Sequence, residues 1–120
     1  MGRRSRRRGA DDALAAPETE YRSPGGDVLV LRGALSPATR GEYRATLAGS
    51  PLSREDAWQR AAEFLFERLA VRWEIAGAEP LARQKELLGR YRFASQDERR
   101  WIRDVLRRHL AENFPDLDPP

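Results

Sequence analysis

The sequence predicts a mainly α protein: a small four-helix domain with a short N-terminal strand or β-hairpin and a disordered, Arg-rich N-terminal tail. Four segments combine a helix-start signal with apolar residues at helical spacing. Ahead of them, two short extended runs flank a turn-rich tetrad, and the first residues are basic without apolar periodicity. We therefore divide the chain into a disordered basic tail over residues 1–17, a strand or hairpin over 18–34, a helical domain over 35–117 and a C-terminal tail over 118–120.

Length and composition are typical of a small globular protein. The chain has 120 residues, which suits one domain, and 40% hydrophobic beside 34% charged residues allow one modest core. No run approaches the ~18 consecutive apolar residues of a membrane span. There is no cysteine for a disulfide, a zinc site or a thiol nucleophile. We expect a soluble, cytoplasmic protein without a membrane partner.

The net charge of +3 arises at the start of the chain. Residues 1–8 contain five arginines, and the remainder holds 17 basic against 19 acidic residues. The basic character therefore belongs to the tail and does not extend to the domain. The tail has three open interpretations: a phosphate-binding element, a solubilising segment, or upstream sequence translated from an early start. Its arginines are Arg3, Arg4, Arg6, Arg7 and Arg8.

Turn and capping signals predict the first elements of the domain. The runs TEYR and DVLVL flank residues 23–26, Ser-Pro-Gly-Gly, which predicts a hairpin from about Glu18 to Arg32. Ser36 followed by Pro37 is typical of a helix start. Gly, Ser and Pro over 49–51 end that helix, which therefore reaches about Ala48.

The same kind of signal predicts the last two helices. Glu and Pro at 79–80 open a helix with one apolar side, and Ser95 with Glu98 matches a capping box for a helix to about Asn113. Pro115 stops the pattern. The apolar side of the third helix comprises Leu81, Gln84, Leu87, Leu88 and Tyr91.

The segment from Ser53 to Gly77 is predicted to form one long helix with two apolar stripes. Ser53 caps its start and Gly77 ends it. A helix that hides apolar surface in two directions is either enclosed within its domain or shared with a partner. The wide stripe comprises Trp58, Ala62, Leu65, Phe66, Leu69, Trp73 and Ala76, and the second comprises Ala57, Phe64, Val71 and Ile75.

Charged residues form ridges on the long helix and on the last one. An acidic ridge of Asp56, Glu63, Glu67 and Glu74 lies between the apolar stripes, and Arg68 and Arg72 fill the opposite gap. The acidic ridge is either a solvated face or a docking surface for a basic partner. If the basic ridge of the last helix met it in another molecule, head-to-tail self-association would result. The basic ridge comprises Arg99, Arg100, Arg103 and Arg107.

The sequence contains no recognisable catalytic motif. It lacks a glycine-rich phosphate loop, H-E-x-x-H, G-x-S-x-G and a calcium loop. His109 is the single histidine and borders an apolar stripe, which favours a packing role over acid–base catalysis. An enzyme would need a site built from Glu63, Glu67 and His109, which their spacing does not demand. We expect no enzyme activity, cofactor, metal or small-molecule substrate.

Three segments resemble small proteins of actinobacterial phages and prophages found among tail-assembly genes. They are EDAWQRAAEFLFERLAVRWEIAG, QKELLGRYRFAS and DERRWIRDVLRRHLAENFPDL, and the resemblance covers roughly Leu35 to Leu117. It implies an α-rich tail-assembly chaperone or assembly factor that binds an amphipathic partner such as a tape-measure protein. It supplies no catalytic residues and does not extend to the arginine tail.

Two functions remain open from the sequence. The first is a non-enzymatic assembly or interaction protein that binds a protein partner, or another copy of itself, through the second apolar stripe and its arginines. The alternative is a nucleic-acid-binding accessory or regulatory protein that uses the arginine tail and Arg99, Arg100, Arg103 and Arg107. The predicted partner surface comprises Phe64, Arg68, Val71, Arg72 and Ile75.

Overall fold

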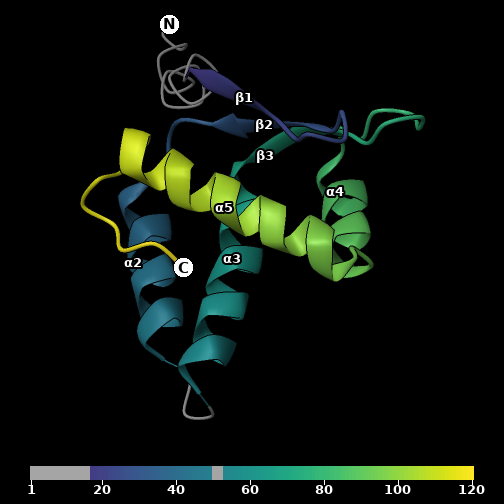
Figure 1. The fold of residues 1–120 in the computed structure, drawn as a ribbon. Helices are drawn as coiled ribbons and strands as arrows, with labels where there is room; N and C mark the ends of the chain where they lie inside the picture. The colour runs from purple at the N-terminus through teal and green to yellow at the C-terminus, as the bar shows by residue number, and fades with distance from the viewer. Residues whose placement is uncertain (1–16, 50–52) are drawn as a thin grey trace, which may run out of the picture.

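The computed structural model describes residues 17–49 and 53–120, so nearly all of the predicted tail lies outside it. These residues form four helices and a three-stranded antiparallel sheet in the order β1-β2-β3. In Figure 1 the sheet lies at the top, α5 crosses in front of α3, and α2 and α3 run side by side away from the sheet. The elements are β1 (Glu18–Arg22), β2 (Val28–Arg32), α2 (Pro37–Ala48), α3 (Arg54–Leu69), β3 (Ala70–Glu74), α4 (Gln84–Arg92) and α5 (Gln96–Asn113).

The predicted hairpin is confirmed. β1 and β2 pair antiparallel from Glu18 opposite Arg32 to Arg22 opposite Val28. The turn closes with a hydrogen bond of 2.9 Å from the Ser23 amide to the Asp27 carbonyl. Gly26 has a φ of 96° there, a backbone conformation that glycine adopts without steric cost.

The prediction of one helix from Ser53 to Gly77 is wrong after Leu69. α3 ends at Leu69, and the next five residues form β3, which pairs antiparallel with β2. Gly77 has a φ of 83° and lies in the turn that follows the strand. Both stripes and the acidic ridge of the predicted helix are therefore divided between a helix and a strand.

The requirement of β2 for a second strand partner explains this switch. Val28, Leu29, Val30 and Leu31 are all buried, and buried amide groups on the free edge of β2 need hydrogen-bond partners. Residues 72–74, Arg-Trp-Glu, alternate polar and apolar side chains, which suits a strand with one face inward. The Trp73 side chain is fully buried in the strand, as it would also have been on a helix stripe.

The third helix begins later than predicted. α4 starts at Gln84, and Leu81 lies in an extended segment that pairs with β3. The Trp73 amide donates to the Leu81 carbonyl, and the Leu81 amide donates back to the Trp73 carbonyl, both at 2.9 Å. Leu81 thereby closes the outer edge of β3 at Trp73.

The predicted caps are present. Ser36 accepts from the Thr39 amide at the start of α2, and Ser53 accepts from the Asp56 amide at the start of α3. At the start of α5, Ser95 forms the complete capping box with Glu98.

The segment after α5 folds back onto the helices. Phe114 and Leu117 are buried in the core, and the Tyr43 hydroxyl on α2 donates to the Asp118 carbonyl. The Arg107 Nε donates to the Pro120 main-chain oxygen at 2.9 Å. Residues 118–120, predicted as a tail, therefore lie against α2 and α5.

The core lies between the inner face of the sheet and the helices. Tyr21, Leu29 and Trp73 occupy one row across the three strands on this face. Phe66 of α3 stacks on Tyr91 of α4 with ring centroids 4.7 Å apart and meets Trp73 edge-on at 5.6 Å. These contacts hold α3, α4 and β3 together. α5 completes the core with Ile102, Leu106, His109 and Leu110.

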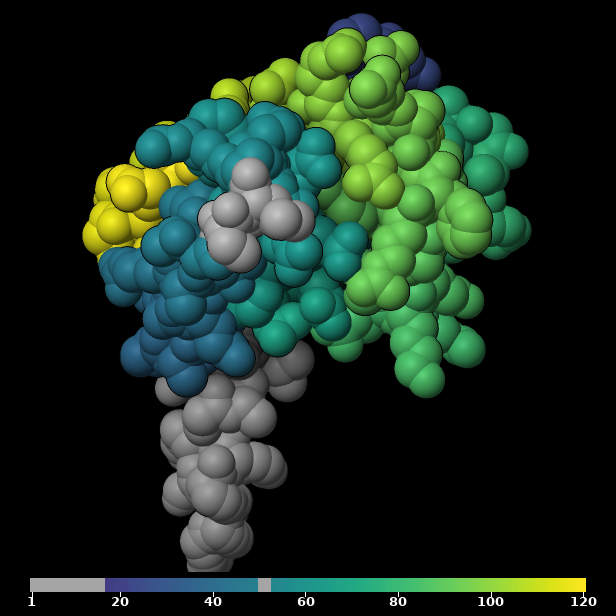
Figure 2. All heavy atoms as spheres, turned by 90° about the horizontal axis from the view of Figure 1, so that it is seen from below, coloured from purple at the N-terminus to yellow at the C-terminus, as the bar shows by residue number. Residues whose placement is uncertain are grey.

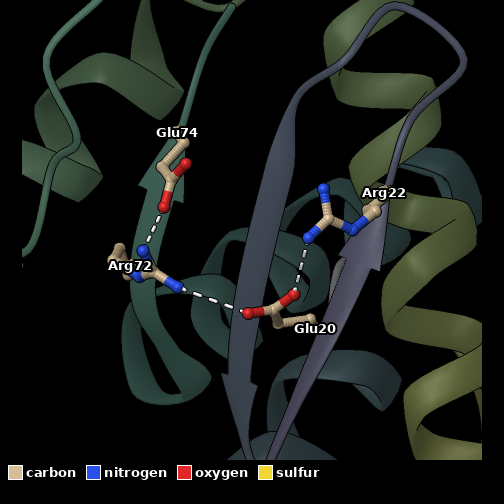
Figure 3. Close-up of polar contacts among 4 residues, drawn as sticks. All are labelled: Glu20, Arg22, Arg72 and Glu74. Carbon is tan, nitrogen blue, oxygen red and sulfur yellow. Dashed lines mark hydrogen bonds and ion pairs between the residues drawn. The ribbon is translucent and has the colours of Figure 1, made fainter.

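The outer face of the sheet carries charged side chains in place of a covering helix. Figure 3 shows Glu20 of β1 reaching across β2 to Arg72 of β3, at 3.5 Å. Glu20 also pairs with Arg22 at 3.2 Å, and Arg72 pairs with Glu74. Val28 and Val30 of β2 share this face by register, yet they are only 6% and 4% exposed. Both valines are therefore nearly inaccessible to water, although no helix covers this face.

Candidate binding groove between α3 and α5

The residues predicted as one partner surface do not share a helix face. Phe64 and Arg68 lie on α3, where the Arg68 guanidinium stands 4.5 Å above the Phe64 ring. Phe64 and Ile75 pack partly against the core, and Arg72 belongs to the outer face of the sheet. Val71 lies at the irregularity where β3 shifts register against β2. These residues divide between α3 and the sheet region, which removes the stripe on which the prediction depended.

The predicted acidic ridge is also interrupted. Glu63 pairs with Arg92 of α4 at 3.0 Å, and Glu67 pairs with Arg68 at 2.9 Å. Glu74 belongs to β3. The ridge is therefore not one continuous face, and we do not retain the head-to-tail association of an acidic with a basic ridge.

The four arginines predicted on the last helix do come together, in a groove between α3 and α5. The groove has a volume of about 580 Å³, and Figure 2 shows α3 and the α4–α5 region meeting on this side of the molecule. Trp58 contributes from α3 and Tyr91 from α4. The lining residues are Glu55, Trp58, Gln59, Ala62, Tyr91, Gln96, Arg99, Arg100, Arg103, Asp104 and Arg107.

Two of these arginines are fixed against aromatic rings. The Arg103 guanidinium lies 5.3 Å from the Trp58 ring centroid and pairs with Glu55 at 3.0 Å. Arg99 lies 5.0 Å from the Tyr91 ring centroid. Such stacking orients a guanidinium. Both arginines also donate within the chain, Arg99 to the Arg92 and Ala94 carbonyls and Arg103 to Glu55 and the Pro120 main-chain oxygen.

The other two arginines have fewer constraints. The Arg107 Nε donates to the Pro120 main-chain oxygen, and Arg100 pairs with Asp97 at 3.1 Å. Both side chains are exposed. The side chains of Arg100 and Arg107 can therefore turn towards a ligand at small structural cost.

The groove has an excess of positive charge. Four arginines line it beside two carboxylates, Glu55 and Asp104. A hydrogen bond from Gln59, followed by one from Arg103, lowers the pKa of Glu55, which keeps this carboxylate ionised. With two positive charges in excess, the groove favours an anionic group over a cationic one.

A second cavity, of about 610 Å³, lies between α2, α3 and the C-terminal segment. Its charged lining is balanced, with Arg44 and Arg54 facing Asp116 and Asp118. Arg44 pairs with Asp116 at 2.9 Å. This cavity has neither the charge excess nor the convergent arginines of the groove.

An exposed aromatic side chain follows α4, two residues after Tyr91 of the groove. Phe93 follows α4 and is 87% exposed, and it is the one large hydrophobic side chain so exposed among the described residues. Arg99 of the groove donates to the carbonyls on both sides of it, those of Arg92 and Ala94. A groove arginine thus holds the main chain on both sides of Phe93, although the ring itself is largely exposed.

His109 is buried and bonded to the hairpin. Its Nε2 lies 2.8 Å from the Arg32 carbonyl, and its Nδ1 lies 2.8 Å from the Tyr21 hydroxyl. A carbonyl only accepts, so Nε2 carries the proton and Nδ1 accepts from Tyr21. Burial lowers the pKa of His109. Burial, followed by the charge of Glu112, raises the pKa of Tyr21 to about 12, so its hydroxyl remains a donor.

The three residues considered for an enzyme site are each bonded to other groups and not to one another. Glu63 and Glu67 form ion pairs with neighbouring arginines, whereas His109 holds the hairpin to α5. Over residues 17–49 and 53–120, no three His, Cys, Asp or Glu side chains gather as a metal site would require. In the same ranges, none of the helices has the length and apolar character needed to cross a membrane.

Sequence reasoning found the arginines of the groove but not its walls. The spacing of Arg99, Arg103 and Arg107 on one helix face identified them directly. Trp58 was assigned to the wide apolar stripe of the predicted helix, although it is only partly buried and stacks under Arg103. Tyr91 lies on another helix, 33 residues after Trp58 in the chain, and no local sequence pattern indicates that Tyr91 and Trp58 line the same groove.

Comparison with protein-family models, curated proteins and solved structures gives no match for this chain.

The burial of neutral His109 leads us to expect that the folded protein loses stability in mild acid. Because burial lowers its folded-state pKa below the usual value of about 6.5, the unfolded chain takes up the proton first as the pH falls. The stabilising contribution of neutral His109 is therefore present above about pH 6.5 and is lost as the pH falls through its folded pKa. The free energy of unfolding, measured by urea denaturation, should decline between pH 7 and 5 by at most about 1.4 kcal/mol per pH unit.

A His109→Gln variant supplies the control, because its amide does not titrate. Its free energy of unfolding should start lower than that of the wild type and stay nearly level over the same range. Equal slopes for the two proteins would show that another group causes the acid sensitivity.

Proposed function

We propose that this protein is a non-catalytic interaction protein that holds an acidic segment of a partner protein in the groove between α3 and α5. The convergence of four arginines with Trp58 and Tyr91 in one concave site carries this proposal. Guanidinium groups bind carboxylates through two parallel hydrogen bonds, and aromatic walls accept the apolar parts of a peptide. An assembly role on an amphipathic partner, which the sequence resemblance implies, is compatible with such a site.

The exposed Phe93 supports a partner with apolar as well as acidic side chains. Aromatic residues next to arginines are typical of the small set of contacts that supply most binding energy at protein interfaces. Phe93 has 87% of its surface accessible, so an apolar partner group placed on it would remove that surface from water. The groove and Phe93 together suit a segment in which acidic and apolar residues are interspersed.

The charge balance of the domain favours a protein partner over nucleic acid. The described residues hold 17 basic and 17 acidic side chains, so the domain has no net positive field to attract a polyanion. Glu55 and Asp104 also line the groove, where they would repel a phosphate backbone. A peptide can place amide groups opposite these carboxylates.

The proposal predicts selective binding of an acidic peptide. The probe is a capped hexapeptide of alternating Glu and Leu, with a Gln and Leu peptide as its neutral control. In a titration followed by two-dimensional NMR of the full chain, the Glu peptide should shift the Trp58 indole N–H and Arg103 Nε–H resonances. The Gln peptide should shift them several-fold less, because surface charge pairs contribute about 0.2–1 kcal/mol each.

Variants of two exposed groove arginines test the same binding. The double variant Arg100→Gln with Arg107→Gln should weaken binding of the Glu peptide about 2- to 10-fold. Phe93→Ala should weaken the binding of both peptides. The matched control, Arg60→Gln with Arg83→Gln, removes the same charge from exposed positions outside the groove lining. Equal effects of the two double variants, or equal binding of the two peptides, would contradict the proposal.

Nucleic-acid binding is the second candidate, because the four arginines predicted for it line one groove. The five tail arginines of that prediction lie outside the described residues. If all four groove arginines contact phosphates of single-stranded DNA, the logarithm of affinity should fall with log salt at a slope of roughly -3. A gel-shift titration of the full chain measures this slope, and Arg100→Gln with Arg107→Gln should reduce it. Absence of binding at low salt would remove this candidate.

A further inference from the structure

β1 is an outer strand of the sheet whose second edge has no strand partner among the described residues. Two hydrogen bonds fix the direction in which its main-chain groups point. The Ser23 amide donates to the Asp27 carbonyl at 2.9 Å, and the Gly33 amide donates to the Pro17 carbonyl at 2.8 Å. The main-chain amide and carbonyl groups of residues 17 and 23 therefore point towards β2. Because these groups alternate between the two edges along a strand, those of residues 19 and 21 also point towards β2. The amide and carbonyl groups of Glu18, Glu20 and Arg22 point away from β2.

The two outer edges of the sheet differ. On β3, Trp73 points its amide and carbonyl away from β2, and Leu81 bonds to both. On β1, Glu18, Glu20 and Arg22 are all exposed, and in Figure 1 no other described element borders this edge. Exposed strand edges are templates for pairing with another strand. Among the described residues, Leu81 closes the β3 edge, and no strand pairs with the β1 edge.

We propose that β1 pairs antiparallel with β1 of a second copy of this chain, about a two-fold axis at Glu20. The sequence Glu-Thr-Glu-Tyr-Arg of β1 suits this register. With Glu20 opposite Glu20 of the second copy, Glu18 lies opposite Arg22 in both halves. Every outward amide and carbonyl of Glu18, Glu20 and Arg22 then finds a partner, and the two three-stranded sheets become one continuous sheet.

The charges on the outer face complement one another in this register. Glu18 forms no ion pair within the described residues, and Arg22 is 71% exposed while pairing with Glu20. Cross-strand pairs of opposite charge contribute about 0.2–1 kcal/mol each. The two Glu20 carboxylates at the axis are flanked by Arg22 and Arg72 of their own chains, which offsets their repulsion. On the inner face, Thr19 lies opposite Tyr21 of the second copy.

The pairing leaves the groove accessible. β1 contacts α5 through Tyr21, which bonds to His109 and Glu112 in the C-terminal half of that helix. The groove is lined from α5 by residues between Gln96 and Arg107 and from α3 by residues between Glu55 and Ala62, and no residue of β1 lines it. A pair of copies would therefore present two grooves, and a partner with two acidic segments would bind it more tightly than one copy.

A five-residue edge forms a small interface, so the pair dissociates on dilution. Sedimentation equilibrium of the full chain, from micromolar to millimolar concentration, should show a mass rising from 13.7 kDa towards twice that value. A monomer over this whole range would overturn the proposal.

Glu20→Pro separates pairing between copies from pairing within the chain. Proline removes the Glu20 amide, which points away from β2, so β1 keeps its hydrogen bonds to β2 while the edge loses a central donor. Glu20→Ala is the matched control, because it also removes the ion pair with Arg72 but keeps the amide. We expect Glu20→Pro to weaken self-association at least tenfold more than Glu20→Ala does. Equal association of the two variants would overturn the proposal.

A charge exchange decides the register even if the proline variant fails to fold. Glu18→Arg alone and Arg22→Glu alone each place like charges opposite one another and should weaken self-association several-fold. The double variant Glu18→Arg with Arg22→Glu restores opposite charges and should recover it. If both single variants associate like the wild type, or the double variant is weaker than both, the proposed register is wrong.

Discussion

Two-sided burial of β2 is the constraint on which the rest of the structure depends. Its apolar side chains face helices on one side and a layer of ion-paired side chains on the other, while its main chain needs a strand on each edge. β1 supplies one edge through a tight hairpin. The other edge is supplied by residues 70–74, and the chain therefore leaves the helical conformation at Leu69. The termination of α3 is a consequence of tertiary pairing and not of a local stop signal.

Local signals in the sequence identified the elements that have local causes. The hairpin, the three serine caps and the extent of α5 follow from residues close together in the chain, and they are confirmed. β3 was missed because the apolar positions of residues 69–76 fit a helix, and Trp73 faces inward under either conformation. The polar, apolar and polar order of residues 72–74 was the available strand signal. It is only three residues long, so it could not outweigh the helical pattern before it.

The candidate site was partly predictable for the same reason. Arginines at helical spacing on α5 share a face whatever the rest of the chain does, so they could be named from the sequence. The opposing wall depends on how α3 and α4 pack against α5, which the stacking of Phe66 on Tyr91 and against Trp73 determines. By ending at Leu69, α3 divides the apolar stripe that was expected to bind a partner. The same packing places Trp58 opposite the arginines of α5.

NMR of residues 70–77 in the full chain tests the central claim most directly. If residues 70–74 pair with β2, Leu29 and Trp73 form a pair without mutual hydrogen bonds, whose Cα atoms are about 4.5 Å apart. A strong cross-strand nuclear Overhauser effect between their α-protons, with slowly exchanging Arg72 and Glu74 amides, is the expected result. Helical chemical shifts continuing from Leu69 to Ile75, without that cross-peak, would contradict the account.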